Sequence, residues 1–175
     1  AKALSSAYLP ISAVMVSDHV YGPLAEQAAQ RVIFGHGYTY SAHPVCAAVA
    51  LRTQQLIVER DIIGHVCRIA PAFAARVERF DRFDFIGNVR ALGLIGAMEF
   101  CADRRSGGKF DPSHKIAAKA VAKIQEHGVI LRALPGDIVG FCPPLIITED
   151  ELHDLFDQVE LAMDAMQSIA DEIRT

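Results

Sequence analysis

The sequence predicts an α/β protein in which the end of a larger domain is followed by a small α+β domain. Short apolar runs typical of buried strands alternate with longer stretches whose apolar residues recur at helical spacing. The pattern changes near residue 85, and the order after it is strand, helix, strand, strand, helix. We expect residues 1–44 to end the larger domain, residues 45–80 to form interdomain helices and residues 81–175 to form the small domain.

The composition is that of a soluble globular protein. Of the 175 residues, 51% are apolar and 22% are charged, and the net charge is −4. This balance offers no basic surface for nucleic acid or for an anionic membrane. The cysteines are widely spaced and the histidines are scattered, unlike the close ligand pairs of zinc sites. We therefore expect no metal, no nucleic-acid or membrane partner, and a cytoplasmic location.

The elements of the first half follow from apolar runs and helix breakers. Residues 11–17 form a charge-free apolar run, which predicts a strand buried on both faces. Residues 19–32 are expected to form a short helix. A second helix is expected over residues 44–60, started by proline and packed on several sides. Gly64 is expected to break the chain before a third helix that ends near residue 79.

The second half begins with an almost wholly apolar, glycine-bearing run that ends in Glu99, which we expect to pair with a cation. Its glycines, Gly93 and Gly96, are expected to allow close packing. Thr148 and Glu151 form a capping box that predicts the start of the last helix. The predicted elements are a strand over 89–100, a helix over 111–128, strands over 129–132 and 138–142, and a helix from the box to about residue 174.

Lys2 is the first candidate functional residue, in the opening run Ala-Lys-Ala-Leu-Ser-Ser-Ala-Tyr-Leu-Pro. A single lysine is usually a solvated surface charge. Here no other charged residue follows before Asp18, and the predicted buried strand comes shortly after the lysine. A buried lysine loses its proton more readily and can then attack an aldehyde.

Two later segments hold candidate binding residues. The run His-Gly-Tyr-Thr-Tyr-Ser-Ala-His-Pro places the Thr39 hydroxyl and backbone amides directly before a predicted helix start, which favours a small anion site. Arg132 lies in Val-Ile-Leu-Arg-Ala-Leu-Pro-Gly-Asp-Ile, and a guanidinium binds a carboxylate through two parallel charge-assisted hydrogen bonds. By themselves, these patterns also fit a glycine-rich turn and a surface arginine on an edge strand.

In this order, the three segments resemble the class III aminotransferases, the ω-transaminase family, over essentially all 175 residues. The resemblance implies the C-terminal part of a fold type I transferase that depends on pyridoxal 5'-phosphate (PLP). It implies that Lys2 is the catalytic lysine, which holds the PLP cofactor as a Schiff base. Thr39 and its neighbour Tyr38 would bind the PLP phosphate of the partner subunit in a homodimer. Arg132 would bind the substrate carboxylate.

The activity implied by the resemblance is ping-pong transamination from an amine or amino acid donor to a keto acid such as pyruvate. Because the chain opens on the lysine, the acid that pairs with the pyridine nitrogen, the ring-stacking aromatic and the main phosphate loop are expected in an N-terminal half of the same enzyme. We therefore expect the 175 residues alone to be inactive.

Alternatives remain open within and outside this family. Enzymes like glutamate-semialdehyde aminomutase or dialkylglycine decarboxylase share the lysine and the threonine but differ at the position of Arg132. A non-catalytic dimerisation module that retains the motifs is a third possibility. Ala3, Ala7 and Ala42 stand where many family members have glycine. The added methyl groups limit the backbone angles or tighten the pocket, which leaves the size of the substrate open.

Overall fold

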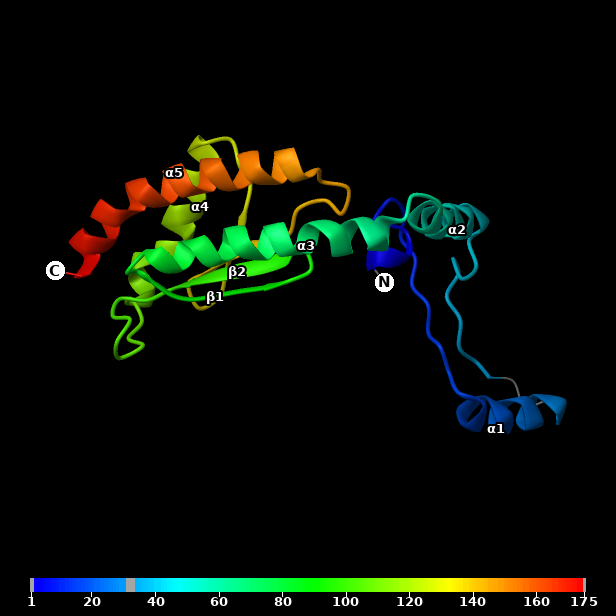
Figure 1. The fold of residues 1–175 in the computed structure, drawn as a ribbon. Coiled ribbons are helices and arrows are strands. Elements are labelled where there is room, and N and C mark those ends of the chain that lie inside the picture. Colours follow the sequence, from blue (N-terminus) through cyan, green and yellow to red (C-terminus); the bar gives the residue numbers. More distant parts are fainter. Residues whose placement is uncertain (1, 31–33, 175) are drawn as a thin grey trace. The chain divides into compact units, whose positions relative to one another are not determined.

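The chain divides into two units, Ala1–Asp61 and Ile62–Thr175. The computed structural model describes residues 2–30 and 34–174, and the side chain of Lys2 lies outside that description. The first unit contains a short 3₁₀ helix, η1 (Lys2–Leu4), and the helices α1 (Asp18–Ala29) and α2 (Pro44–Glu59) (Figure 1). These helices confirm the predicted helix over residues 44–60 and the described part of the one over residues 19–32.

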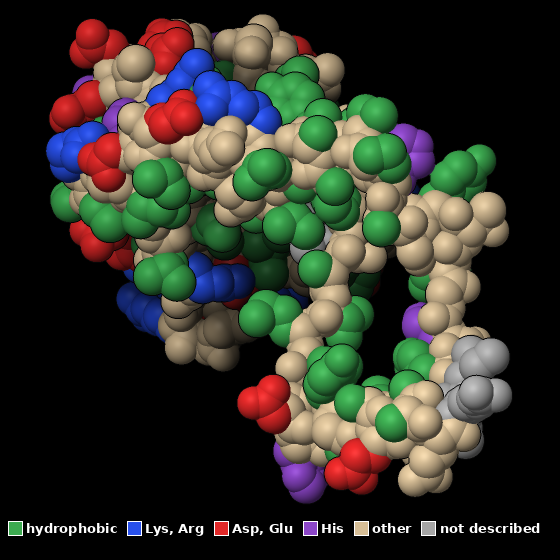
Figure 2. All heavy atoms as spheres, turned by 90° about the vertical axis from the view of Figure 1, so that its right-hand side faces the viewer, with side chains coloured by type: hydrophobic (Ala, Val, Ile, Leu, Met, Phe, Trp, Pro, Cys, Tyr) green, Lys and Arg blue, Asp and Glu red, His purple; other side chains and the backbone are tan. Residues whose placement is uncertain are grey.

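Residues 11–17 do not form the predicted buried strand. They are described without regular secondary structure, and Val14 and Met15 are 88% and 97% exposed. A strand needs the backbone hydrogen bonds of a neighbouring strand, and no described segment of the first unit supplies one. Among the described residues of this unit only Ser5 and Ala50 are buried. Hydrophobic side chains are accordingly scattered over the surface in Figure 2.

The break after α2 lies at Asp61 and not at Gly64. Asp61 has a φ of 47°, in the left-handed region where short polar residues are tolerated. Helix α3 (Ile62–Glu78) begins directly after it, so that Gly64 lies inside the helix. The prediction of a break at Gly64 was wrong because a glycine can also lie within a helix. The helical backbone is interrupted instead at Asp61, the residue with the positive φ.

The second unit is built on one antiparallel sheet. Its strands lie in the order β1-β2-β4-β3, and each pairs only with antiparallel neighbours among the described residues. The strands are β1 (Ile86–Leu92), β2 (Ile95–Phe100), β3 (Arg132–Leu134) and β4 (Ile138–Phe141). Strand β3 lies at the edge of the sheet and begins at Arg132, where we expected the strand over residues 129–132 to end.

The predicted single strand over residues 89–100 is a hairpin. Gly93 has a φ of 59° and turns the chain between β1 and β2. Periodicity missed the turn because the whole run is apolar. Gly96 permits close packing, as expected: a Cβ there would lie only 3.0 Å from the Phe73 ring and 3.1 Å from Val77. The absence of a side chain at this point therefore lets α3 approach the sheet.

A short 3₁₀ helix and two α-helices follow the β1–β2 hairpin in the sequence. The predicted helix over residues 111–128 is split, because Lys115 has a φ of 49° between η3 (Pro112–His114) and α4 (Ile116–Glu126). Gly128 ends this stretch with a φ of 85°, as predicted. Helix α5 (Glu149–Arg174) begins with the expected capping box. The Thr148 amide donates to Glu151 Oε2 at 2.8 Å and the Glu151 amide donates to Thr148 Oγ1 at 3.3 Å.

Buried aromatic rings hold the helices of the second unit to the sheet. The Phe156 ring on α5 lies 5.5 Å from Phe73 on α3 and 5.4 Å from Phe141 on β4, measured between ring centroids. All three side chains are buried, and aromatic pairs at these separations are favourable. In Figure 1, α5 lies above α3, and strands β1 and β2 lie below α3. The aromatic cluster thereby fixes β4 and, through it, the edge strand with Arg132.

Ion pairs complete the second unit. Glu99 on β2 pairs with Lys109 and with Arg90, whose Nη1 lies 3.2 Å from Glu99 Oε2. The Lys109 hydrogen bond, helped by Arg90, holds the pKa of Glu99 below its ordinary value. The expected pairing of Glu99 with a cation is therefore confirmed. Between α3 and α5, the buried Arg76 lies 3.0 Å from the buried Glu160. These contacts indicate a structural role for the ion pairs of Glu99 and for the pair between Arg76 and Glu160.

Candidate active site

The segment after Lys2 forms a tight turn. The Tyr8 amide donates to the Ser5 carbonyl at 3.0 Å, and Ser5 Oγ donates to the Leu9 carbonyl at 2.7 Å. Ser6 and Ala7 have φ values of 47° and 63°, both in the left-handed region. The structure places the Lys2 backbone in η1, directly before this turn, while the lysine amine lies outside the described part.

A side chain from α2 also reaches this segment. Gln54 Nε2 donates to the carbonyls of Ala3 and Leu4, at 3.2 Å and 3.1 Å. The sequence analysis did not single out Gln54, because a glutamine on a helix carries no local signal for such a contact. Only the path of the chain brings it beside residues that are 51 and 50 positions away.

The predicted anion-binding segment is a turn that leads into α2. The Ser41 amide donates to the Tyr38 carbonyl at 2.9 Å, and the Tyr38 amide donates to Ser41 Oγ at 3.1 Å. The amides of Thr39 and Tyr40 meet no acceptor among the described residues, and Thr39 is exposed. Residues 34–47 contain no Asp or Glu. A hydroxyl, two open amides and no negative charge fit the phosphate group of a cofactor such as PLP.

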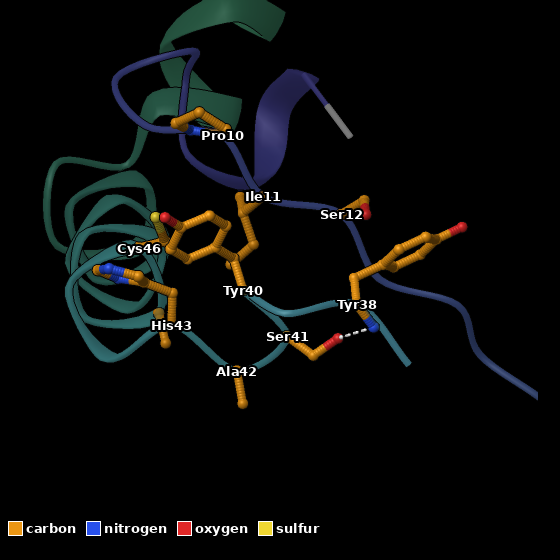
Figure 3. Close-up of a pocket in the computed structure, with 10 residues that line it drawn as sticks. Pro10, Ile11, Ser12, Tyr38, Tyr40, Ser41, Ala42, His43 and Cys46 are labelled. Atoms are coloured by element: carbon orange, nitrogen blue, oxygen red, sulfur yellow. Dashed lines mark hydrogen bonds between the residues drawn. The ribbon is translucent and has the colours of Figure 1, made fainter. Parts of the chain in front are cut away.

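A hollow of about 870 Å³ lies between this turn and the lysine segment. Figure 3 shows Pro10, Ile11 and Ser12 along one side and the turn with the start of α2 along the other. Of the predicted site residues, Tyr38 lines the hollow, whereas Lys2 and Thr39 are not among the described lining residues. His43 also lines it, and its buried Nδ1 has no hydrogen-bond partner among the described residues. Most buried polar nitrogens in folded proteins have a hydrogen-bond partner, so His43 Nδ1 is unusual in this respect.

Two of the three alanines at which we expected glycine in many family members lie in strained backbone. Ala7 and Ala42 have φ values of 63° and 56°, which confirms that their methyl groups bear on the backbone angles, whereas Ala3 is not among the residues with positive φ. The left-handed conformation costs an L-residue about 1–2 kcal/mol, and glycine escapes that cost.

We therefore expect Ala42→Gly to raise the free energy of unfolding by about 1 kcal/mol in urea denaturation of the full-length protein, because strain relief exceeds the added chain entropy. Ala48→Gly, at an exposed position inside α2, is the matched control. It should lower stability by about 0.5–1 kcal/mol, because glycine is unfavourable in a helix interior. Equal destabilisation at both positions would contradict strain at Ala42.

Arg132 lies in the second unit, at the start of edge strand β3. It is exposed and has no side-chain hydrogen bond or ion pair with any described residue. A hollow of about 520 Å³ is lined by Arg132, by Phe141 and Pro143 at the end of β4, and by Asp154 on α5. A guanidinium without a fixed partner at the wall of a hollow is available to a ligand carboxylate.

The described residues hold few other candidates for chemistry. Within residues 2–30 and 34–174, no group of three or more His, Cys, Asp or Glu side chains is arranged to hold a metal ion. In the same part of the chain, no helix has the length and apolar character to span a bilayer. The four cysteines are free thiols.

Comparisons with known proteins show the family of the chain. A family model described as Aminotransferase class-III matches residues 1–163. An uncharacterized aminotransferase of Sinorhizobium fredii is 39% identical over 175 residues, which cover 99% of this chain and 37% of that protein. A mitochondrial gamma aminobutyrate transaminase of Solanum lycopersicum is 40% identical over 155 residues, covering 89% of this chain and 30% of that protein.

Solved structures are similar along nearly the whole chain. A PMP-bound aminotransferase from Vibrio fluvialis has a TM-score of 0.89 at 30% identity, covering 95% of this chain and 37% of that one. A transaminase from directed evolution by ancestral reconstruction has a TM-score of 0.90 at 41% identity, covering 98% of this chain and 37% of that one. The chain thus spans about a third of the length of these relatives.

The fold and these matches place the chain among the aminotransferases that share the fold type I architecture. It belongs to the class III aminotransferases, a PLP-dependent family, which confirms the resemblance found in the three sequence segments.

Proposed function

We propose that the protein transfers an amino group from an amine or amino acid donor to a keto acid. The observation that carries the proposal is the family match over residues 1–163, which includes all three motif segments. When bound, PLP supplies the electron sink for the bonds that break at the substrate carbon. The residues of this chain then have to attach and orient the cofactor, bind the substrate and move protons.

Lys2 is proposed to attach the cofactor through its amine and to carry the proton that moves during transfer. A lysine acts in this way when its amine is neutral, which burial or a neighbouring cation favours. The lysine segment contains no carboxylate before Asp18, so nothing within it stabilises the protonated amine. This charge pattern supports the assignment of Lys2 as acid–base group and nucleophile.

Thr39 is proposed to bind the cofactor phosphate with its hydroxyl and its amide, with Tyr38 beside it. In the arrangement that the family resemblance implies, this phosphate belongs to the partner subunit of a homodimer. The open amides of Thr39 and Tyr40 and the lack of acidic residues over residues 34–47 support an anion at this turn. Helix α2 begins directly after the turn, and its N-terminus favours negative charge.

Arg132 is proposed to bind the substrate carboxylate, with pyruvate as the acceptor. The Solanum lycopersicum relative is named a gamma aminobutyrate transaminase, and gamma-aminobutyrate carries a carboxylate as well as an amine. A free guanidinium suits the carboxylate of either substrate. An uncharged amine donor would require the same side chain to move aside, which its exposure and lack of partners permit.

The exposed apolar residues of the first unit are proposed to pack against an N-terminal half of the same enzyme. Val14 and Met15 are the most exposed of these. Burial of side chains of this size stabilises a contact by about 1.5–3 kcal/mol each. This partner would also supply the acid for the pyridine nitrogen, the ring-stacking aromatic and the main phosphate loop. The cytoplasm is the proposed location.

Borohydride reduction of the full-length protein with PLP, followed by peptide mapping, tests the central assignment. We expect a reduced adduct on Lys2, because borohydride fixes the bond between the lysine amine and the cofactor aldehyde. An unmodified Lys2 would favour the non-catalytic dimerisation module instead. In a separate assay without borohydride, a donor amine and pyruvate should yield alanine. If Lys2 carries the reduced adduct but the assay yields neither alanine nor a pyridoxamine form of the cofactor, an aminomutase-like or decarboxylase-like enzyme is favoured.

A further inference from the structure

Gln54 makes a specific contact with the backbone that follows Lys2. Its Nε2 lies 3.2 Å from the Ala3 carbonyl oxygen and 3.1 Å from that of Leu4. Carbonyl oxygens only accept hydrogen bonds, so the carboxamide must turn its NH₂ group toward them. That group has two hydrogens, which serve one carbonyl each. The contact therefore uses the full donor capacity of the side chain.

Local preferences do not hold this stretch of backbone in place. The last carbonyls of a short helix such as η1 have no partner within the helix. Ser6 and Ala7 follow in the left-handed region, which residues with a Cβ disfavour. The hydrogen bond from Ser5 Oγ to the Leu9 carbonyl closes the turn but links it to no other element. Gln54 supplies a hydrogen-bonded link between α2 and η1, directly before this turn.

We propose that Gln54 is a positioning residue for Lys2, because it fixes the backbone from which the lysine side chain extends. The inference rests on the proposed function, in which the Lys2 amine attaches the cofactor. The same helix begins at the phosphate turn, and Gln54 lies ~15 Å further along its axis at 1.5 Å per residue. Helix α2 thus carries the turn with Thr39 at one end and the contact to the lysine segment in its middle.

Three variants of the full-length protein separate this role from a general effect on α2. Gln54→Met keeps the length of the side chain and removes both donors. Gln54→Lys keeps a donor that reaches the same carbonyls. Gln55→Met is the matched control, since Gln55 is the exposed neighbour on α2 and accepts from Arg52 at 3.3 Å, away from the lysine segment.

The first readout is hydrogen–deuterium exchange in the cofactor-free protein. We expect the peptide over residues 3–9 to exchange about five- to tenfold faster in Gln54→Met, because the turn loses its tether. Gln54→Lys and Gln55→Met should exchange at the wild-type rate. Unchanged exchange in Gln54→Met, or equal acceleration in Gln55→Met, would overturn the proposal.

The second readout is the reaction of the loaded enzyme. Gln54→Met should lower kcat about tenfold and leave KM for the keto acid unchanged, because a misplaced amine slows proton transfer without touching the carboxylate site. The pH dependence of the cofactor absorbance should shift in Gln54→Met and stay at the wild-type value in Gln55→Met. If Lys2 takes up no adduct in wild-type protein, the proposed function fails. Normal kcat with a labelled Lys2 overturns the positioning role alone.

Discussion

Replacing Lys2 with alanine is expected to lower the rate of amino-group transfer by the full-length enzyme at least about a thousandfold. The alanine variant has no amine to attach the cofactor and no group at that place to carry the proton. The family match supports this expectation, and so does the lack of any charged residue between Lys2 and Asp18. The measurement is the formation of alanine from pyruvate with a donor amine at saturating PLP.

Two controls separate loss of chemistry from loss of fold. Lys2→Arg keeps a positive charge but offers no neutral amine, because arginine stays protonated. It should therefore be as inactive as Lys2→Ala. Lys119→Ala removes an exposed lysine of α4 and should leave the rate unchanged. If Lys2→Ala keeps a tenth of wild-type turnover while its thermal unfolding matches wild type, Lys2 is not the catalytic lysine.

Replacing Arg132 with methionine is expected to raise KM for pyruvate roughly 10- to 100-fold, because hydrogen bonds to a charged group are worth about 1.5–3 kcal/mol. The Arg132 side chain is exposed at the wall of a hollow and has no hydrogen bond or ion pair with a described residue, so no such contact is lost with it. KM for an amine donor that lacks a carboxylate should not rise. Steady-state kinetics with each substrate varied in turn measures both effects.

The geometry of the guanidinium can be separated from its charge. Arg132→Lys restores a positive charge without the planar fork and should recover only part of the affinity for pyruvate. Arg105→Met, in an exposed loop, is the matched control and should change neither KM. An unchanged KM for pyruvate in Arg132→Met would leave Arg132 as a surface arginine on an edge strand. That outcome would favour the aminomutase-like or decarboxylase-like alternative.

Elements with strong local signals could be predicted from the sequence. Pro44 marks the first turn of α2, and the Thr148–Glu151 capping box marks the start of α5. Gly128 ends the stretch that contains α4. These signals act through neighbouring backbone groups, so a short window of sequence contains all the atoms that matter.

Elements that depend on distant partners could not be predicted in this way. The apolar run over residues 11–17 has the composition of a buried strand, yet a strand exists only where another strand pairs with it. The run over residues 89–100 hides a turn at Gly93, because continuous apolar residues show no period that marks a hairpin. The break at Asp61 likewise depends on a positive φ that composition did not reveal.

In the candidate site, too, some features follow from local sequence and others depend on distant parts of the chain. The three segments that contain Lys2, Thr39 and Arg132, and their order along the chain, predicted the family through their resemblance to it, because a motif can be read from a short run of residues. Only the tertiary structure placed Gln54 against the backbone after Lys2. It also showed that Ala42 adopts left-handed backbone angles. Both depend on how the chain folds back on itself, since a contact across fifty residues and a dihedral angle are properties of the path and not of the residue.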